Sequence, residues 1–481
     1  MTEQVSWAEV KQKFKQVWGY DDFRPPQGEV IANLLNQKDS LVVLATGGGK
    51  SICFQLPALL KKGLTLVISP LLALMEDQVM DLRKRQLPAG TLHSALTPRD
   101  RRQVLANLQG LRLLYLSPET LLSEPVWQKL CDPDLEIVGM MLDEAHCLVH
   151  WGDTFRPAYR RLGAVRPALA QVKPKHPPIA IAAFTATANP TAQAELKSCL
   201  QLTDPQIVCT SPYRPHLSLN VAVAWSMADR KKRALQFIRA FPKQSGLVYM
   251  RSRREVEELA EWLKTEGFQA IGYHGGLPAR ERREIEKQWL SGAVPFVVTT
   301  NAFGMGVNMP TVRWVLHFHS PLTLADYIQE VGRGGRDGKP AVALMLVSEP
   351  TGLLDNTDRQ RMEFFVKEEQ KLQQRAKQII PKLPQRGKYQ EVIKIAEDVP
   401  IALGLLHSAK QLVWHSPFEY EITTTKPKLP ETESRAIAEM QGFINSKDCR
   451  WAYLMRAFGF AQEALGLKCG RCDNCTKKQN W

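Results

Sequence analysis

The chain lacks the long apolar runs that identify a membrane protein. Its longest apolar runs have the length of a β-strand, whereas a membrane-spanning helix needs about 20 consecutive apolar residues. The stretch Met1–Val5 shows no basic segment leading into an apolar one, so no secretory signal is predicted. No repeat of solenoid period is apparent either. These absences predict a cytoplasmic protein with no membrane partner.

Acidic residues are fewer than basic ones. The chain has 63 lysines and arginines against 49 aspartates and glutamates, a formal net charge of +14. Such a surplus favours a polyanionic partner, although many basic proteins bind none. At 481 residues, 44% of them hydrophobic, the chain is too long for one core, and three or four domains are expected.

Cysteine is sparse until the end of the chain. Five of the nine cysteines are scattered through the first 210 residues, where core thiols are expected, and the other four are Cys449, Cys469, Cys472 and Cys475. The spacing of the last three brings three thiolates close together, and four sulfurs suit a structural Zn²⁺ site. A disulfide pair and an iron–sulfur cluster are the alternatives.

Short apolar runs alternate with helical patterns along two stretches of the chain. This rhythm predicts two tandem α/β domains, each with a doubly wound parallel sheet. The strands expected in the first domain are 40–45, 64–69, 112–116, 137–142 and 179–185. Those expected in the second are 246–250, 270–273, 296–300, 312–318 and 341–347.

The first expected strand runs into a glycine-rich turn and then a helix. The turn residues are Thr46, Gly47, Gly48, Gly49, Lys50 and Ser51. The glycines let backbone N–H groups close on a phosphate, the lysine supplies a point charge and the serine can hold Mg²⁺. The strict phosphate-loop pattern has glycine at position 44, where this chain has Leu44.

The expected strand 137–142 ends in two carboxylates, Asp143 and Glu144. Ligands of an open parallel sheet bind at this end of the strands, so we expect Asp143 to hold Mg²⁺ and Glu144 to orient a water. The loop that follows carries Trp151, Phe155 and Arg156, an arrangement suited to stacking bases and contacting phosphate. One short stretch is therefore predicted to report DNA occupancy to the hydrolytic site.

These segments occur in the order of superfamily 2 helicase motifs, and the chain resembles a RecQ-type DNA helicase over about residues 14–347 and again from Cys449. The segments that carry the resemblance are 23–27, 46–51, 69–71, 117–119, 143–157, 185–188, 302–308 and 329–338. The resemblance implies ATP-driven 3′ to 5′ movement on single-stranded DNA and unwinding at duplex junctions, in recombination or repair.

The resemblance also implies roles for single residues. Tyr20, Arg24 and Gln27 would recognise adenine ahead of the phosphate loop. Gln329 and Arg333 would face the nucleotide from the second domain, with Arg336 as arginine finger. RecQ proteins carry a similar four-cysteine module, which favours zinc. The cofactors expected are thus ATP, Mg²⁺ and Zn²⁺.

The chain departs from the larger RecQ proteins, in which a winged helix follows the zinc module. Here six residues follow Cys475, while the stretch before the zinc cysteines is long. Expected helices 389–397 and 401–410 and expected strands 412–414 and 419–423 have the order of a small winged helix. Two interpretations of this stretch are equally favoured. It is either a winged helix that has moved upstream of the zinc module or an insertion that only packs on the motor.

We therefore expect two RecA-like domains, a winged-helix-like segment and a zinc module. The boundaries expected are 1–208, 209–347, 348–430 and 431–481. An ATP-dependent DNA helicase is the predicted function. The alternatives are an RNA-remodelling ATPase and a DNA-binding or annealing protein that uses ATP as a conformational switch.

Overall fold

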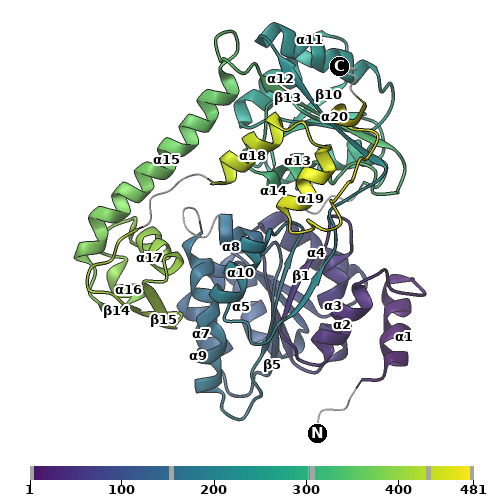
Figure 1. Cartoon of the computed structure of the whole chain (residues 1–481). Helices are drawn as coiled ribbons and strands as arrows, with labels where there is room; N and C mark the ends of the chain where they lie inside the picture. Colours follow the sequence, from purple (N-terminus) through teal and green to yellow (C-terminus); the bar gives the residue numbers. More distant parts are fainter. Residues whose placement is uncertain (1–4, 151–155, 302, 304–308, 430–434, 477–481) are drawn as a thin grey trace. The chain divides into compact units, whose positions relative to one another are not determined.

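The computed structural model describes residues 5–150, 156–301, 303, 309–429 and 435–476. Within these residues the chain forms two compact units, each around a parallel β-sheet (Figure 1). We call them the first lobe and the second lobe. No helix in the described part of the chain is both long and apolar enough to cross a membrane.

The sheet of the first lobe has the strand order β3-β4-β2-β5-β6-β1-β7, and neighbouring strands are parallel. Its strands are β1 (Ser40–Val43), β2 (Leu64–Ile68), β3 (Ala89–Leu92), β4 (Leu113–Leu116), β5 (Ile137–Leu142), β6 (Ala180–Thr185) and β7 (Gln206–Cys209). The five expected strands are confirmed, and β3 and β7 are additions. Parallel pairing explains why the central strands β2, β5 and β6 are largely apolar, because helices cover both faces of the sheet.

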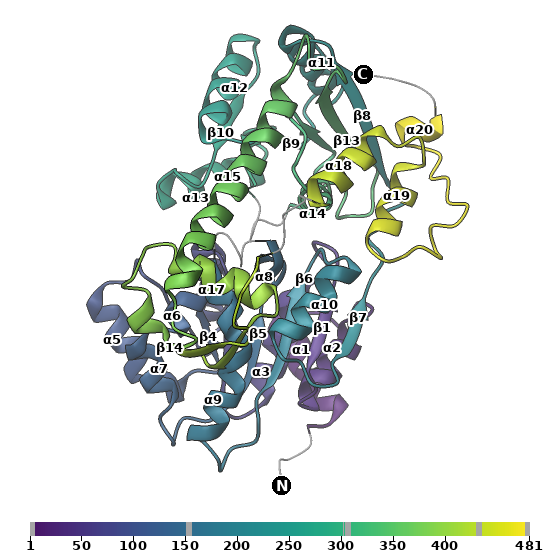
Figure 2. The same cartoon turned by 60° about the vertical axis from the view of Figure 1, so that its left-hand side comes forward.

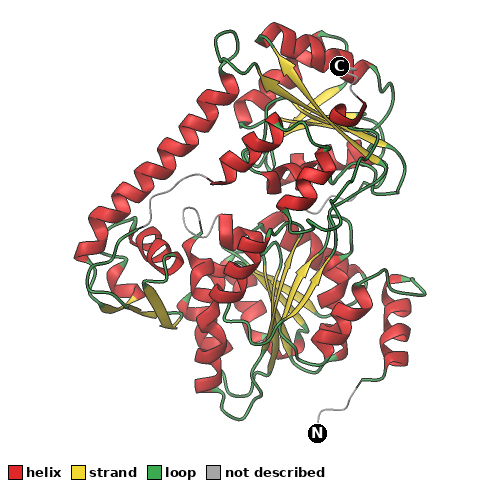
Figure 3. Ribbon diagram, viewed as in Figure 1, coloured by secondary structure: helices red, strands yellow, loops and turns green. Residues whose placement is uncertain are grey.

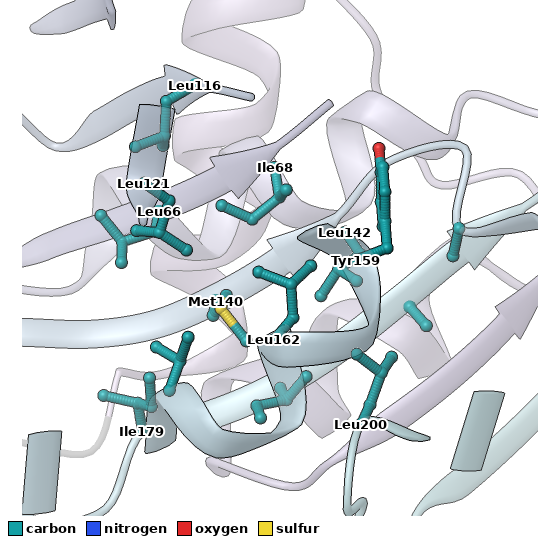
Figure 4. Packing of buried hydrophobic residues seen from close by; sticks show 14 of the residues in the cluster. Leu66, Ile68, Leu116, Leu121, Met140, Leu142, Tyr159, Leu162, Ile179 and Leu200 are labelled. Atoms are coloured by element: carbon teal, nitrogen blue, oxygen red, sulfur yellow. The ribbon is translucent and has the colours of Figure 1, made fainter. Parts of the chain in front are cut away.

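Two separate cores cover the faces of this sheet. One core joins the strands to α2 (Gln27–Leu35), α3 (Lys50–Leu60) and α4 (Leu72–Lys84). The other joins them to α6 (Pro118–Leu121), α7 (Glu124–Leu130), the 3₁₀ helix η2 (Pro157–Ala164), α9 (Val165–Val172) and α10 (Pro190–Cys199). In Figure 4, Tyr159 and Leu162 of η2 lie over Leu142 and Met140 of β5. The remaining elements are α1 (Trp7–Trp18), α5 (Pro98–Ala106), η1 (Leu108–Gly110) and α8 (His146–His150).

The second lobe repeats this plan with the order β10-β11-β9-β12-β13-β8, again with parallel neighbours. Its strands are β8 (Leu217–Ala224), β9 (Gly246–Tyr249), β10 (Ala270–Tyr273), β11 (Phe296–Thr299), β12 (Trp314–His317) and β13 (Ala341–Ser348). Its helices are α11 (Met227–Arg239), α12 (Arg253–Thr265), α13 (Ala279–Leu290) and α14 (Leu324–Val331). The prediction of two doubly wound parallel sheets is confirmed.

Helix α15 (Thr357–Ile379) leads into a small segment, residues 380–429, which we call the wing segment (Figure 2). It contains η3 (Ile380–Lys382), β14 (Arg386–Lys388), α16 (Tyr389–Val392), α17 (Val399–Ser408), β15 (Leu412–Ser416) and β16 (Glu419–Ile422). Its sheet is antiparallel and has the strand order β14-β16-β15. Figure 3 shows short helices and strands in this segment. The expected order of helix, helix, strand, strand is present. The first helix ends at Val392 rather than at 397, and β14 is an addition.

The wing segment packs with the first lobe, and residues 435–476 pack with the second. The latter contain α18 (Arg435–Asn445), α19 (Arg450–Ala457) and α20 (Asp473–Thr476). Trp451 of α19 is 1% exposed and donates from Nε1 to the carbonyl of Leu217 in β8 at 2.9 Å. The zinc-module cysteines therefore share a core with the second sheet.

Candidate nucleotide, nucleic-acid and zinc sites

The glycine-rich turn lies between β1 and α3, as expected. Gly47 and Gly49 have φ angles of 82° and 76°, a backbone region that favours glycine. A Cβ atom on Gly49 would lie 2.3 Å from Nε2 of Gln27, so no larger residue fits there without a shift. Lys50 is the first residue of α3, and Ser51 follows it. Helix N-termini attract phosphate, which agrees with the predicted role of the turn.

Lys50 meets the strand-end carboxylates directly. Its Nζ lies 3.3 Å from Oε1 of Glu144, and both side chains are 11% exposed. The other carboxylate oxygen of Glu144 lies 3.3 Å from Nδ1 of His146, which is 3.2 Å from Oγ1 of Thr185 at the end of β6. A continuous polar chain thus joins the glycine-rich turn to the 185–188 segment. Glu144 has a φ angle of 49°, unusual for a residue other than glycine and frequent at functional sites.

The two carboxylates differ in acidity. Burial, and next the charge of Glu144, raise the pKa of Asp143 to about 6. Burial also raises the pKa of Glu144, but the charge of Lys50 and the hydrogen bond with His146 outweigh it and hold that pKa well below its usual value. A cation beside Asp143 would offset its desolvation.

The three residues predicted to recognise adenine lie before and at the start of α2. Gln27 is 3% exposed; its Oε1 accepts from the backbone N–H of Arg24 at 3.0 Å, and its Nε2 donates to the carbonyl of Gly48 at 3.1 Å. Gln27 therefore ties this segment to the glycine-rich turn. Tyr20 is 51% exposed, with its ring 5.8 Å from that of Phe14, and Arg24 is also exposed.

Of the three loop residues predicted to contact DNA, Trp151 and Phe155 lie outside the described residues. Arg156 is described, and it holds two motif segments together. Its Nε and Nη2 donate to the two carboxylate oxygens of Glu119 at 3.1 and 2.7 Å, and its Nη1 donates to the carbonyl of Pro70. This two-point contact is the strong geometry of an arginine–carboxylate pair. Glu119 as a partner was missed by sequence reasoning, and only its place in a motif segment pointed to it.

The candidates of the second lobe lie on and just after α14. Gln329 is half-buried and Arg333 is 6% exposed. Burial, and next the charges of Arg333 and Arg214, lower the pKa of Arg336 to about 9. Three neighbouring arginines suit an anion such as a phosphate. That these residues face a nucleotide stays a prediction.

The four zinc-module cysteines converge. Their Sγ atoms all lie within 4.8 Å of one another, and those of Cys469 and Cys475 are 3.9 Å apart. Zn–S bonds of about 2.3 Å in a tetrahedron imply S–S separations of roughly 3.8 Å, so the set fits Zn²⁺. The backbone N–H groups of Cys469, Cys472 and Arg450 donate to Sγ of Cys449, Cys469 and Cys472 respectively. All nine cysteines are free of disulfides in this structure.

Family models match three regions of the chain: a DEAD/DEAH box helicase domain over 24–196, a helicase conserved C-terminal domain over 230–338 and a RecQ zinc-binding domain over 409–476. The chain is 49% identical over 471 residues to the ATP-dependent DNA helicase RecQ of Synechocystis, which covers 97% of this chain and 98% of that protein. It is 38% identical over 341 residues to the probable ATP-dependent DNA helicase RecS of Bacillus subtilis, covering 70% and 67% of the two chains.

Solved structures support the fold. Mss116p bound to single-stranded RNA matches with a TM-score of 0.61 at 17% identity, over 73% of this chain and 76% of that one. The helicase MrfA bound to DNA matches with a TM-score of 0.59 at 23% identity, over 76% and 54%. At these identities the likeness concerns the fold alone.

Two parallel-sheet lobes, with a glycine-rich turn beside a strand-end carboxylate pair in the first, define a nucleotide-driven helicase of RecA-like architecture. The four-cysteine site and the near full-length relationship narrow this class. The chain belongs to the RecQ family of ATP-dependent DNA helicases.

Proposed function

We propose that the chain couples ATP hydrolysis in the first lobe to 3′ to 5′ movement along single-stranded DNA, and that it unwinds duplex junctions in recombination or repair. The observation that carries the proposal is the buried chain from Lys50 through Glu144 and His146 to Thr185. It links, through His146, the lysine expected to contact phosphate and the carboxylate expected to orient a water with a hydroxyl of the 185–188 segment.

Hydrolysis would use these residues in order. The N–H groups of the glycine-rich turn and Lys50 hold the phosphates, and Glu144 orients the attacking water. Lys50 gives up its 3.3 Å contact with Glu144 when it reaches a phosphate, so phosphate binding frees the carboxylate for the water. The oxygen donors Ser51 and Asp143 suit Mg²⁺, which in such a site neutralises charge on the phosphates. Arg336 acts on the charge that develops in the transition state.

Arg156 offers a path from DNA to this site. It holds Glu119 and Pro70, which belong to two of the segments that carry the helicase resemblance. It also ends the loop that carries Trp151 and Phe155. We propose that DNA bases stack on Trp151 and Phe155, and that this binding affects Glu144, a few residues away in the sequence.

The RNA-remodelling alternative draws on the same motifs, and the fold alone does not decide it, since RNA-bound and DNA-bound helicases share it. The zinc module and the RecQ relatives favour DNA. A protein that uses ATP only as a switch would not need the complete hydrolytic set.

The test is to separate ATP hydrolysis from DNA binding. Lys50→Ala should lose DNA-stimulated ATP hydrolysis while single-stranded DNA still binds, because the lysine contacts the nucleotide rather than the strand. Both activities are measured on one preparation, with Lys62→Ala, an exposed lysine just beyond the same helix, as the matched control. Stimulated turnover by Lys50→Ala above about a tenth of wild type would contradict the assignment.

A further inference from the structure

Arg161 of η2 is enclosed by aromatic rings of the wing segment. Its side chain is 4% exposed, and its guanidinium carbon lies 3.6 Å from the ring centroid of Tyr389 and 5.6 Å from those of Trp414 and Phe418. Its Nε donates to the carbonyl of Pro417 at 2.6 Å. Cations are attracted to aromatic faces, most strongly where water is excluded. One arginine of the first lobe is thus held by residues more than 200 positions later in the chain.

This cage differs from an ordinary buried ion pair. Within the described residues Arg161 has no carboxylate at ion-pair distance, whereas its neighbour Arg160 lies 2.5 Å from Glu195 of α10. Burial lowers the pKa of Arg161 to about 10, which leaves it charged at neutral pH. The two adjacent arginines therefore hold η2 from two sides, one toward α10 and one toward the wing segment.

At this contact the wing segment packs closely on helices of the first lobe. Pro417 is buried, and the ring of Phe418 lies 5.3 Å from that of Trp127 in α7. Helix α17 contacts η2, has no exposed residue and contains no lysine or arginine. The exposed lysines Lys388, Lys394 and Lys410 lie outside α17.

The placement of η2 also determines where Arg156 lies. Arg156 immediately precedes η2 and bonds to Glu119 and Pro70. Tyr159 and Leu162 of η2 share a core with Met140 and Leu142 of β5 (Figure 4), and Leu142 directly precedes the two carboxylates in the sequence. A shift of η2 would move Arg156 relative to both partners, because only one peptide bond separates them.

We propose that Arg161 is a positioning residue for DNA-dependent ATP hydrolysis: by locking η2 into the aromatic cage of the wing segment, it fixes Arg156 against Glu119 and Pro70. The wing segment is then a structural part of the first lobe that sets how the motor responds to DNA. This inference rests on the proposed function, since it concerns the response of the same ATP site.

The experiment compares three variants of the full chain with wild type. Arg161→Ala removes the cation, and Tyr389→Leu removes the nearest ring from the opposite side. Arg375→Ala is the matched control, because this arginine of α15 is 53% exposed and pairs with Asp398 of the wing segment at 3.2 Å, away from the cage. ATP hydrolysis is titrated with single-stranded DNA and with ATP. Hydrogen exchange is measured over residues 156–164.

Arg161→Ala and Tyr389→Leu should each raise the DNA concentration for half-maximal stimulation by about fivefold or more. Basal turnover and the KM for ATP should stay within about twofold of wild type, and exchange over 156–164 should rise. In the double variant the DNA concentration for half-maximal stimulation should be no higher than in either single variant, because both substitutions remove the same contact. Arg375→Ala should behave as wild type.

Wild-type DNA response and exchange in both cage variants would overturn the inference, and so would an equal loss of basal turnover. Should Arg161→Ala fail to fold, Tyr389→Leu decides alone. A wild-type protein that DNA does not stimulate would instead refute the proposed function, so the two failures are distinguishable.

Discussion

At the residue scale, a few buried charges define this molecule. Lys50 and Glu144 pair at the hydrolytic site, and Arg161 lies in its aromatic cage. In the second lobe Glu330 is 3% exposed and accepts from Nη1 and Nη2 of Arg251 at 2.9 and 3.0 Å and from Nε2 of His317 at 2.8 Å. Glu330 lies between Gln329 and Arg333, so its three bonds fix the backbone that carries both candidates.

Glu330→Gln should destabilise the second lobe by about 3–5 kcal/mol, because it leaves Arg251 buried without its carboxylate. Burial raises the pKa of Glu330, but the charge of Arg251 and the hydrogen bond from His317 outweigh it and lower the pKa to about 2. A lowered pKa means that this stabilisation is fully present above the ordinary value of 4.5 and is lost as the pH falls toward 2.

The difference in unfolding free energy between wild type and Glu330→Gln should therefore shrink between pH 7 and pH 3. Urea unfolding, with hydrogen exchange of β12 and α14 to locate the change, measures it. Glu258→Gln is the control, since Glu258 is 59% exposed in its pair with Arg254 and should change stability little. A loss no larger than that of the control would show that the Glu330 network does not stabilise the lobe.

At the scale of elements, the zinc module depends on its four sulfurs. Cys472→Ser should lose the metal and open the C-terminal segment to protease, because a segment this small gains much of its folding free energy from metal binding. Metal analysis should find one zinc per wild-type chain. Cys131→Ser is the control, because Cys131 lies outside the cluster. An unchanged zinc content in Cys472→Ser would contradict the ligand set.

Apolar strands were predictable from sequence, and mixed ones were not. Strands β5 and β10 match their expected bounds, Ile137–Leu142 and Ala270–Tyr273. Strand β3 reads Ala-Gly-Thr-Leu and β14 reads Arg-Gly-Lys, so neither has an apolar run. Strand β8 lies at the edge of its sheet and begins with alternating apolar and polar residues, and Leu217 and Leu219 share a core with the zinc module, which sequence alone does not place.

The candidate site divides in the same way. The glycine-rich turn and the strand-end carboxylates were predictable, because their chemistry depends on residues adjacent in sequence. The bond of Arg156 to Glu119, the tie of Gln27 to Gly48 and the cage around Arg161 join residues 37, 21 and more than 200 positions apart. Trp414 of β15 is 4% exposed and lies in the core of the wing segment, among residues from several of its elements.

At the scale of the whole molecule, the wing segment belongs to the first lobe and the zinc module to the second. The sequence placed both after the motor as separate domains, because length and composition do not show which lobe a segment packs on. Each lobe therefore carries one accessory element of its own. Under the proposed function, both elements support an ATP-driven DNA motor.

The most direct test of this account is one unwinding assay with wild type and Lys50→Ala on 3′-tailed, 5′-tailed and blunt DNA duplexes and on a 3′-tailed RNA duplex. Wild type should unwind the 3′-tailed DNA with ATP and leave the other three substrates largely paired, and Lys50→Ala should unwind none. Unwinding from the 5′ tail or of RNA at an equal rate, or unwinding by Lys50→Ala, would contradict a 3′ to 5′ DNA helicase driven by this site.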